Sequence, residues 1–279
     1  NAHVELVTIK TTGDKILDSP LSKVGGKGLF VKEIEESLLS GKVDVAVHSM
    51  KDVPAELPEG LVLSAFPKRE DPRDAFVSTQ YQTLNQLPKG SRVGTSSLRR
   101  AAQLLHIRPD LDVLSLRGNV ETRLRKLEAG EFQAIILATA GLKRFGLADR
   151  IRQVFSTDQM LPAIGQGALG LELRADDTEA ISLLDFLNHE PTRITVRAER
   201  AFLKELEGGC QVPIAAFAHL VGKRLHLEGM VAELDGCLIL RDRMGGNEEK
   251  AEEIGVKLAR KLLDAGADRI LADIYGKGP

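Results

Sequence analysis

The sequence predicts an α/β protein made of two α/β units and a small C-terminal α+β unit. Three observations support this fold class. Up to residue 145, short apolar strand patterns alternate with amphipathic helix patterns, which is the order that βαβ units produce. Residues 177–207 have a helical pattern that is interrupted near Asn188 and Pro191. Beyond them, three strand patterns with glycine-containing turns precede one long helix pattern, which predicts an antiparallel meander and a helix.

The composition is that of an ordinary globular protein. Of the 279 residues, 43% are hydrophobic and 28% are charged, which is sufficient for a sizeable core. Because the net charge is only -2, a site for a polyanion must be a local patch. The two cysteines, Cys210 and Cys237, are too few for a disulfide framework and lack metal-site spacing. We therefore expect a reducing compartment, no metal and, since no apolar run approaches about 18 residues, no membrane span.

The first unit is predicted to begin with a strand over residues 4–9 and to continue through the glycine-rich stretch 23–28 into an amphipathic helix that includes Phe30. Helix N-termini bind anions through their free N–H groups. Lys23 and Lys27 before this helix therefore suggest an anion site, and a lid that carries them is compatible with it. A mobile glycine-rich loop without a ligand explains the stretch equally well.

Residues 43–48 have the period of a strand, with three valines alternating with aspartate, alanine and histidine. Pro54 ends the strand pairing. Lys51 and Asp52 thus follow the carboxyl end of a strand, where open α/β sheets bind their ligands. A carboxylate beside an ammonium group there is a candidate for acid–base chemistry. On this stretch alone, a surface Lys–Asp pair in a turn is the favoured alternative.

A charged stretch, residues 68–74, is predicted to link the first unit to the second, with its charges mostly solvated. Strands are predicted at 61–66, 75–78, 92–96, 113–116 and 133–138. Ser96 or Ser97 is expected to cap the helix that follows the third of these strands. Because strands and helices alternate over residues 92–145, we expect right-handed crossovers and a largely parallel sheet.

The second unit carries a basic patch. Between residues 92 and 126 there are eight basic side chains and three acidic ones. Arg99, Arg100, Arg117 and Arg123 are expected to converge at one edge of the sheet. Cations at a helix N-terminus oppose the helix dipole, so an uncompensated arginine pair there is expected to bind an anion. Guanidinium groups match carboxylates or phosphates in a bidentate manner, whereas a solvated basic face remains the alternative.

Residues 165–170 match G-x-G-x-x-G, but they lead into a strand pattern and not into a helix. They are therefore not a dinucleotide-binding fingerprint, and we expect a connection that returns to the first unit. Glycines at 208 and 209 end the preceding helix pattern. Cys210 follows in an exposed type of loop and, from periodicity alone, is more typical of a structural cysteine. The last unit is predicted to have strands at 212–219, 224–232 and 238–243 and a helix at 248–263.

Seven sequence blocks together resemble the porphobilinogen deaminase family. They are VGGKGLF (24–30), HSMKDVP (48–54), REDPRDAF (69–76), GTSSLRR (94–100), LRGN (116–119), GQG (165–167) and EGGCQVP (207–213). One block alone is weak evidence, whereas seven in order at the family's spacing are specific. The resemblance covers nearly the whole chain and implies a transferase of tetrapyrrole and haem biosynthesis.

The resemblance implies two α/β domains similar to the lobes of periplasmic binding proteins, and a third α+β domain with a three-stranded antiparallel sheet. Domain 1 would comprise residues 1–70 with 165–188, domain 2 residues 71–164, and domain 3 residues 189–279. The family also implies a cytoplasmic monomer that takes porphobilinogen as its small-molecule partner and binds neither nucleic acid nor membrane.

By resemblance, Cys210 holds a dipyrromethane cofactor through a thioether. Four porphobilinogen molecules are then joined head to tail with loss of ammonia, which gives the linear tetrapyrrole hydroxymethylbilane. The implied catalytic residue is Asp52. The cofactor is expected to contact Lys51, Thr95, Ser97, Arg99, Arg100 and Gln166. The substrate is expected to contact Ser49, Arg117, Arg123 and Arg144, beneath a lid with Lys23, Lys27 and Phe30. The acetate and propionate groups of porphobilinogen fit the arginine patch.

One feature departs from the family pattern, and two other functions compete with this one. The family normally opens with a further strand and helix that include an Arg-x-Ser segment, so we expect either a preceding segment or an incomplete first sheet. The stronger rival is a non-catalytic two-lobed protein that binds small anions, which has no need of a covalent adduct on Cys210. A nucleic-acid binder is disfavoured because aromatic residues make up 4% of the chain and tryptophan is absent.

Overall fold

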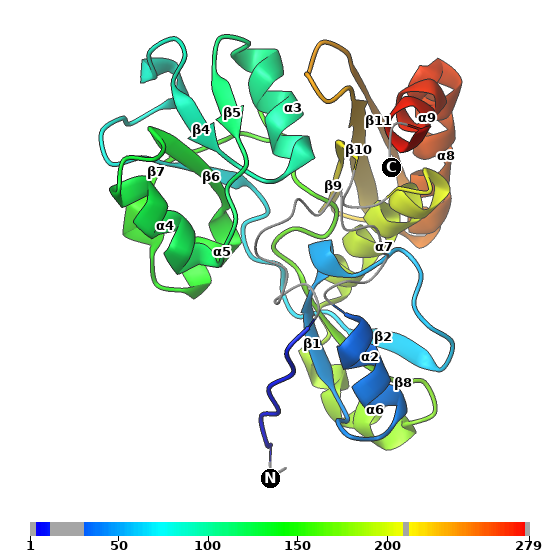
Figure 1. The fold of residues 1–279 in the computed structure, drawn as a ribbon. Coiled ribbons are helices and arrows are strands. Elements are labelled where there is room, and N and C mark those ends of the chain that lie inside the picture. Colours follow the sequence, from blue (N-terminus) through cyan, green and yellow to red (C-terminus); the bar gives the residue numbers. More distant parts are fainter. Residues whose placement is uncertain (1–3, 12–30, 209–211, 277–279) are drawn as a thin grey trace.

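The computed structural model describes residues 4–11, 31–208 and 212–276, which form three units around three separate sheets (Figure 1). The strand orders are β1-β8-β2 in the first sheet, β5-β4-β6-β3-β7 in the second and β11-β10-β9 in the third. The predicted α/β class is confirmed, including the three-stranded C-terminal sheet. The domain boundaries stay a prediction, which the chain's passage from sheet to sheet supports.

The first sheet consists of β1 (Ala46–Ser49), β2 (Leu61–Ala65) and β8 (Leu169–Arg174). β8 lies between the other two strands and is antiparallel to both, so the chain returns to the first unit after residue 165, as predicted. Helix α2 (Lys32–Leu39) packs on this sheet through Leu38, and helix α6 (Thr178–Leu184) packs through Ile181.

The side chains of β1 face the opposite way from the predicted pattern. Val47 is 65% exposed, whereas His48 is buried. A buried histidine requires a polar partner. His48 has one in Glu172 of β8, whose carboxylate lies 2.7 Å from the histidine Nε2. The sequence showed the period of this strand. Which of its two faces is buried depends on Glu172, which is distant in the sequence.

The strand predicted over residues 4–9 is wrong. These residues form no strand, and Leu6 is 93% exposed. A strand exists only where a neighbouring strand supplies hydrogen bonds. An apolar pattern of period two carries no information on whether a neighbouring strand is present.

The second sheet combines parallel and antiparallel strands, so the prediction of a largely parallel sheet holds only in part. Its strands are β3 (Asp74–Val77), β4 (Arg92–Gly94), β5 (Asp112–Leu114), β6 (Ala134–Ala138) and β7 (Ile151–Val154). β4 is parallel to β5 and β6, whereas β3 is antiparallel to β6 and β7. β3 enters from the first unit and therefore begins at the edge where the parallel strands end.

Three helices accompany the second sheet: α3 (Leu98–Ile107), α4 (Val120–Glu128) and α5 (Thr139–Arg144). Leu104 of α3 belongs to one apolar cluster, and Leu124 of α4 belongs to another. Neighbouring residues of β3 alternate between the two clusters, because Phe76 joins the first and Ala75 the second. The sheet is therefore covered on both faces.

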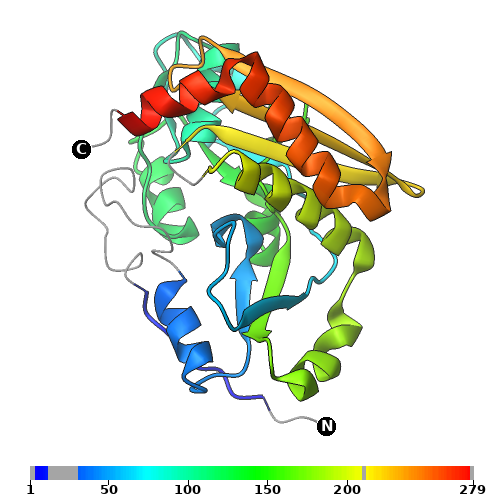
Figure 2. The same ribbon diagram turned by 90° about the vertical axis from the view of Figure 1, so that its right-hand side faces the viewer.

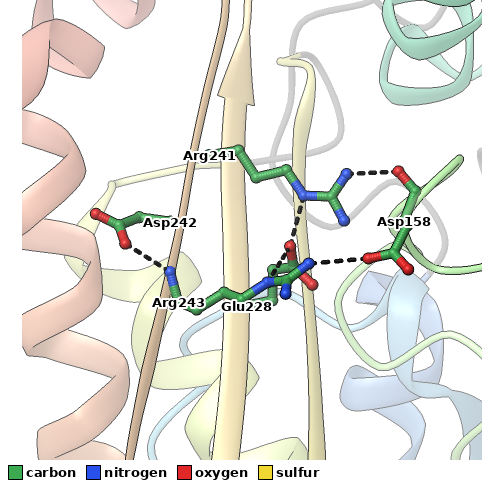
Figure 3. A pocket seen from close by; sticks show the side chains of 5 residues that line it. All are labelled: Asp158, Glu228, Arg241, Asp242 and Arg243. Carbon is green, nitrogen blue, oxygen red and sulfur yellow. Dashed lines mark hydrogen bonds and ion pairs between the residues drawn. The ribbon is translucent and has the colours of Figure 1, made fainter.

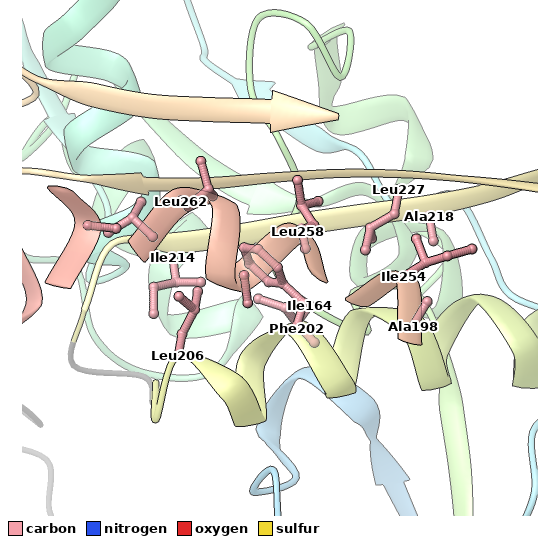
Figure 4. Packing of buried hydrophobic residues seen from close by; sticks show 14 of the residues in the cluster. Ile164, Ala198, Phe202, Leu206, Ile214, Ala218, Leu227, Ile254, Leu258 and Leu262 are labelled. Carbon is pink, nitrogen blue, oxygen red and sulfur yellow. The ribbon is translucent and has the colours of Figure 1, made fainter. Parts of the chain in front are cut away.

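The third unit has the predicted antiparallel meander of β9 (Ile214–Val221), β10 (Arg224–Ala232) and β11 (Ile239–Asn247). Helices α7 (Glu190–Glu205) and α8 (Ala251–Leu262) lie side by side against one face of this sheet, and α9 (Asp268–Gly276) follows them (Figure 2). Phe202 and Leu258 fill the space between helices and sheet (Figure 4). A Cβ on Gly229 would lie 2.6 Å from the Phe202 ring, so β10 needs glycine there.

The shorter helical turns join these elements. Single 3-10 turns lie at Met50–Asp52 (η2), Leu84–Gln86, Ala148–Arg150, Asp185–Leu187 and Glu248–Lys250, and a π turn spans Leu263–Ala267. Within the described ranges, no helix has the length and apolar character needed to cross a membrane.

The third unit also contacts the second. Ala102 of α3 and Met230 of β10 share an apolar cluster. At the edge of this contact, Arg241 and Arg243 bind Glu228 and the Asp158 loop around a hollow of about 490 Å³ (Figure 3). Because both guanidinium groups are paired with protein oxygens, this hollow lacks the free cations of an anion site.

Candidate active site

The four arginines of the basic patch meet where the parallel strands of the second sheet end. β4 and β5 are adjacent, so Arg99 and Arg100 after β4 lie beside Arg117 after β5. Burial lowers the pKa of Arg123, and the charges of Arg100 and Arg117 act in the same direction, which shows that these groups are close. The predicted convergence at one sheet edge is confirmed.

The arginine pair at the start of α3 is partly compensated, contrary to expectation, because one carboxylate is shared by the two guanidinium groups. Asp74 at the start of β3 accepts hydrogen bonds from Arg99 Nη1 at 2.7 Å and from Arg100 Nε at 2.9 Å. The exposed fractions are 0% for Asp74, 4% for Arg99 and 6% for Arg100. Burial raises the pKa of Asp74, but the guanidinium groups of Arg100 and Arg99 outweigh it and bring that pKa to about 2. The expectation that the charges of residues 68–74 are mostly solvated is therefore wrong at Asp74.

Gln166 completes this buried group from the segment that returns to the first unit. Its Nε2 donates to Asp74 Oδ1 at 3.0 Å and to the Pro72 carbonyl at 2.6 Å. Its Oε1 accepts from Arg100 Nη2 at 3.3 Å. Arg144 lies next to it and donates to the carbonyl of Gly167 at 2.8 Å. The sequence placed Gln166 and Arg144 at a ligand site, and the structure places both where the chain crosses between the first two units.

The glycines of the G-x-G-x-x-G match serve close packing. Gly165 and Gly167 have φ values of 68° and 85°, a backbone region that favours glycine. A Cβ on Gly165 would lie 2.7 Å from Met50 Cβ, and one on Gly167 would lie 2.5 Å from the Glu70 carbonyl oxygen. The two glycines thus let residues 165–167 pass closely between η2 and the segment that contains Glu70. Close packing therefore explains the motif without a bound nucleotide.

Asp52 belongs to the first unit and faces the arginines of the second. It ends η2, directly after β1, and its side chain is exposed. Its negative charge acts on Lys51, Arg100 and Arg123, which places these groups around it. Burial lowers the pKa of Lys51, whereas Asp52 opposes that change. Lys51 is half-buried and Asp52 is exposed, so the alternative of a surface Lys–Asp pair in a turn fits Asp52 but not Lys51.

Basic side chains outnumber acidic ones in this group. Lys51, Arg99, Arg100, Arg117 and Arg123 face Asp52 and Asp74. Two buried donors, Nε of Arg99 and Nε of Arg117, have no hydrogen-bond partner among the described residues. An excess of positive charge with unused N–H donors suits a ligand with several carboxylates.

The remaining predicted residues are placed as follows. Ser97 caps α3 by accepting from the Arg100 N–H, and the Thr95 hydroxyl accepts from the Ser97 N–H at 3.2 Å. Both hydroxyls thus shape the loop that carries the arginine pair. Ser49 ends β1 opposite Leu169. Lys23, Lys27, Phe30 and Cys210 lie outside the described residues.

Sequence reasoning missed a buried carboxylate that joins the third unit to both connections between the first two units. Glu199 of α7 binds Arg69 through two hydrogen bonds of 2.6 and 3.1 Å. It also accepts from the N–H groups of Gly165 at 2.7 Å and Ala218 at 2.9 Å. One signal was present, because Glu199 stands on the apolar face of a helix, three residues before Phe202. An acid at such a position requires buried partners.

Fold and site together define a three-unit α/β protein with a cluster of basic side chains that Asp52 and Asp74 face. The family model described as "Porphobilinogen deaminase, dipyromethane cofactor binding domain" matches residues 1–182, and "Porphobilinogen deaminase, C-terminal domain" matches residues 193–264. The chain therefore belongs to the porphobilinogen deaminase family, which confirms the resemblance found in the sequence.

Similar proteins with this name occur in several bacteria. The chain is 58% identical to the porphobilinogen deaminase of Nitratidesulfovibrio vulgaris (strain DSM 19637 / Miyazaki F) over 280 residues, which cover 99% of this chain and 88% of that protein. It is 58% identical to that of Syntrophotalea carbinolica over 269 residues, which cover 96% and 85%.

Solved structures of low sequence identity align with part of the chain. An ABC transporter periplasmic substrate-binding protein from Coxiella burnetii aligns with a TM-score of 0.40 at 16% identity, covering 61% of this chain and 81% of that chain. A nutrient binding protein from Burkholderia cenocepacia, bound to methionine, aligns with a TM-score of 0.39 at 15% identity, covering 62% and 80%.

Proposed function

We propose that this chain joins four porphobilinogen molecules head to tail, with release of ammonia, and forms the linear tetrapyrrole hydroxymethylbilane. The observation that carries the proposal is the position of Asp52 against an excess of arginine and lysine charge, in a chain 58% identical to proteins named for this activity. A protein that only binds small anions would need the cations but not the opposing carboxylate.

The cations account for substrate recognition. Porphobilinogen carries an acetate and a propionate, so a growing chain gains two carboxylates with each unit. Unlike Arg99 and Arg100, the guanidinium groups of Arg117 and Arg123 have no carboxylate partner among the described residues. Within the same residues, Arg123 donates only to the Gly118 carbonyl, and Arg117 Nε has no hydrogen-bond partner. Charge-assisted hydrogen bonds to these guanidinium groups would hold the side chains of the substrate. Arg144 and Ser49 border the same site in the proposal.

Asp52 accounts for the chemical step. The aminomethyl group of porphobilinogen reacts as its ammonium form: the C–N bond breaks, ammonia leaves with the bonding electrons, and the substrate ring keeps the positive charge. Among so many basic groups, this cation needs an anion beside it, and the Asp52 carboxylate supplies that charge. The free α-carbon of the terminal pyrrole then attacks the methylene carbon of this cation, and when the new C–C bond has formed the attacking pyrrole carbon loses a proton, which Asp52 accepts and passes on.

The residues present fit a dipyrromethane. Its carboxylates match the buried donors of Arg99 and Arg117 that lack partners among the described residues. When bound, this group supplies the first nucleophilic pyrrole carbon. We propose that Lys51, Thr95, Ser97, Arg99, Arg100 and Gln166 bind it, and that Cys210, shortly after α7 in the sequence, attaches it through a thioether. A lid with Lys23, Lys27 and Phe30, a monomeric state and a cytoplasmic location complete the proposal.

The decisive experiment is an intact mass measurement combined with an assay of product and ammonia. We expect the purified protein to be heavier than its sequence by two linked pyrrole units. Cys210→Ser should lose this mass and the activity, whereas Cys237→Ser, at an exposed free thiol, should keep both. An unmodified protein with full activity, or one that binds porphobilinogen without releasing ammonia, would contradict the proposal.

A further inference from the structure

Arg200 of α7 reaches from the third unit to the segment directly after Asp52. Its Nη2 donates to the carbonyls of Pro54 at 2.8 Å and Ala55 at 3.1 Å, and its Nη1 donates to that of Val53 at 3.3 Å. Three successive carbonyls are thus bound by one guanidinium. Only arginine presents its donors in such a planar fork.

The Arg200 side chain is half-buried, and three hydrogen bonds to backbone carbonyls hold its guanidinium. Burial lowers the pKa of Arg200 to about 10, and the charge of Glu172 opposes this change. The side chain therefore keeps its charge at neutral pH. Hydrogen bonds from a charged donor are about twice as strong as neutral ones, so this contact holds the carbonyls firmly.

The backbone around Asp52 is held on two sides. Before Asp52, β1 pairs with β8, and the Met50 N–H donates to the Ala168 carbonyl at 3.0 Å. After Asp52, Arg200 binds the three carbonyls. The Asp52 side chain itself has no hydrogen bond to any described residue, so its position depends on these two backbone anchors.

The same helix holds the connections between the first two units. Glu199, next to Arg200, binds Arg69 in one connection and the Gly165 N–H in the other. Gly165 precedes Gln166, which contacts the buried arginine group. Glu199 and Arg200 are adjacent on α7. Arg200 therefore fixes the segment after Asp52, and Glu199 fixes the connection that leads to the arginines, relative to the same helix.

We propose that Arg200 is a positioning residue for the reaction, which holds the backbone after Asp52 against α7 and so sets where the Asp52 carboxylate stands relative to Arg100 and Arg123. Arg200 acts through Asp52 and not through contact with the substrate. The inference rests on the proposed function of Asp52. Displacement of a reacting group by about 1 Å can lower a rate on the order of a hundredfold.

The kinetic test compares Arg200→Gln with Arg197→Gln. Arg197 is on the same helix, is exposed and pairs with Glu252, so its replacement removes a like charge without touching the Asp52 segment. We expect Arg200→Gln to lower kcat roughly ten- to a hundredfold per adduct-bearing molecule with little change in KM, because only positioning is lost. Arg200→Lys should lose less. A kcat for Arg200→Gln equal to that of Arg197→Gln would overturn the proposal.

A second measurement needs neither substrate nor activity. Amide hydrogen exchange in residues 50–56 should be faster in Arg200→Gln than in the parent and in Arg197→Gln, because the three carbonyls lose their anchor. Unchanged exchange there would overturn the proposal. If Arg200→Gln does not fold, Arg200→Lys replaces it in both the kinetic and the hydrogen-exchange comparison. A parent protein without turnover would refute the proposed function, and the exchange result would still decide whether Arg200 anchors this segment.

If Arg200 acts through Asp52, the effects of replacing Arg200 and Asp52 on kcat should be coupled. In the double variant Arg200→Lys with Asp52→Glu, the losses in kcat should not multiply, because the second change moves a carboxylate that the first has already displaced. Losses that multiply fully would show that the two residues act independently and would overturn the proposal.

Discussion

The carboxylate of Asp74 lies 2.7 Å from the guanidinium of Arg100, and the two side chains are 0% and 7% exposed. This buried pair joins the start of β3 to the start of α3. Asp74 therefore orients Arg100, and it shares its one negative charge between Arg100 and Arg99. The excess positive charge that remains for a ligand comes from the neighbouring basic residues.

Replacing Asp74 by asparagine should destabilise the protein strongly. The variant leaves Arg99 and Arg100 buried without a negative charge, and breaking a buried pair in this way costs about 3–5 kcal/mol. The control is Asp71→Asn, because Asp71 pairs with Arg73 and Lys143, whose side chains are 44% and 42% exposed, and such pairs contribute about 0–1 kcal/mol each. Urea unfolding of both variants measures the difference. Equal stability of the two would contradict the role given to Asp74.

The same carboxylate predicts how stability depends on acid. The folded protein holds the pKa of Asp74 at about 2, below the ordinary value of 3.8 for this side chain. A lowered pKa stabilises the fold above the unfolded pKa, and this stabilisation is lost as pH falls from about 4 to about 2. It amounts to about 2 kcal/mol. The stability difference between parent and Asp74→Asn should therefore shrink on acidification, and a difference that stays constant down to about pH 3 would refute this.

What the sequence could predict was set by short-range patterns. Alternating strands and helices placed Arg100 and Arg117 at neighbouring strand ends, and the structure agrees. The partners of these charges were not predictable, because Asp74 is 25 residues from Arg99 and Glu199 is 130 residues from Arg69. Sequence periodicity carries no information about which distant chain segment supplies the opposite charge.

Glu199→Gln should weaken the attachment of both connections to α7. Glutamine keeps one acceptor but loses the charge that faces Arg69, so we expect a loss of about 3–5 kcal/mol in the free energy of unfolding. Glu205→Gln is the matched control, because Glu205 pairs with Arg260, whose side chain is 67% exposed. Thermal and urea unfolding give the comparison. If the two variants unfold alike, the four hydrogen bonds of Glu199 do not contribute as the geometry suggests.

Arg123→Leu should impair substrate binding and leave the fold intact. Within the described structure, Arg123 donates only to the Gly118 carbonyl, so little stability depends on it. Loss of a charge-assisted hydrogen bond costs about 1.5–3 kcal/mol, which corresponds to a roughly ten- to hundredfold rise in KM. Arg125→Leu removes an exposed arginine from the same helix and should have no such effect. An unchanged KM in Arg123→Leu would show that this arginine is only part of a solvated face.

Asp52→Asn separates chemistry from binding. Asp52 is exposed and makes no hydrogen bond to the described residues, so the amide fits without disturbing the fold. The variant should therefore unfold at the parent's temperature and still bind porphobilinogen. It lacks the negative charge that stabilises the substrate cation and the group that accepts the proton, so we expect turnover to fall on the order of a hundredfold or more.

Asp52→Glu should retain more activity than Asp52→Asn, because the charge survives although its position shifts. Product formation from porphobilinogen is the assay, with thermal unfolding as the folding control. If asparagine at this position supports the parent's turnover, Asp52 is only the end of a turn, and the charge that faces Arg100 and Arg123 has no part in the reaction.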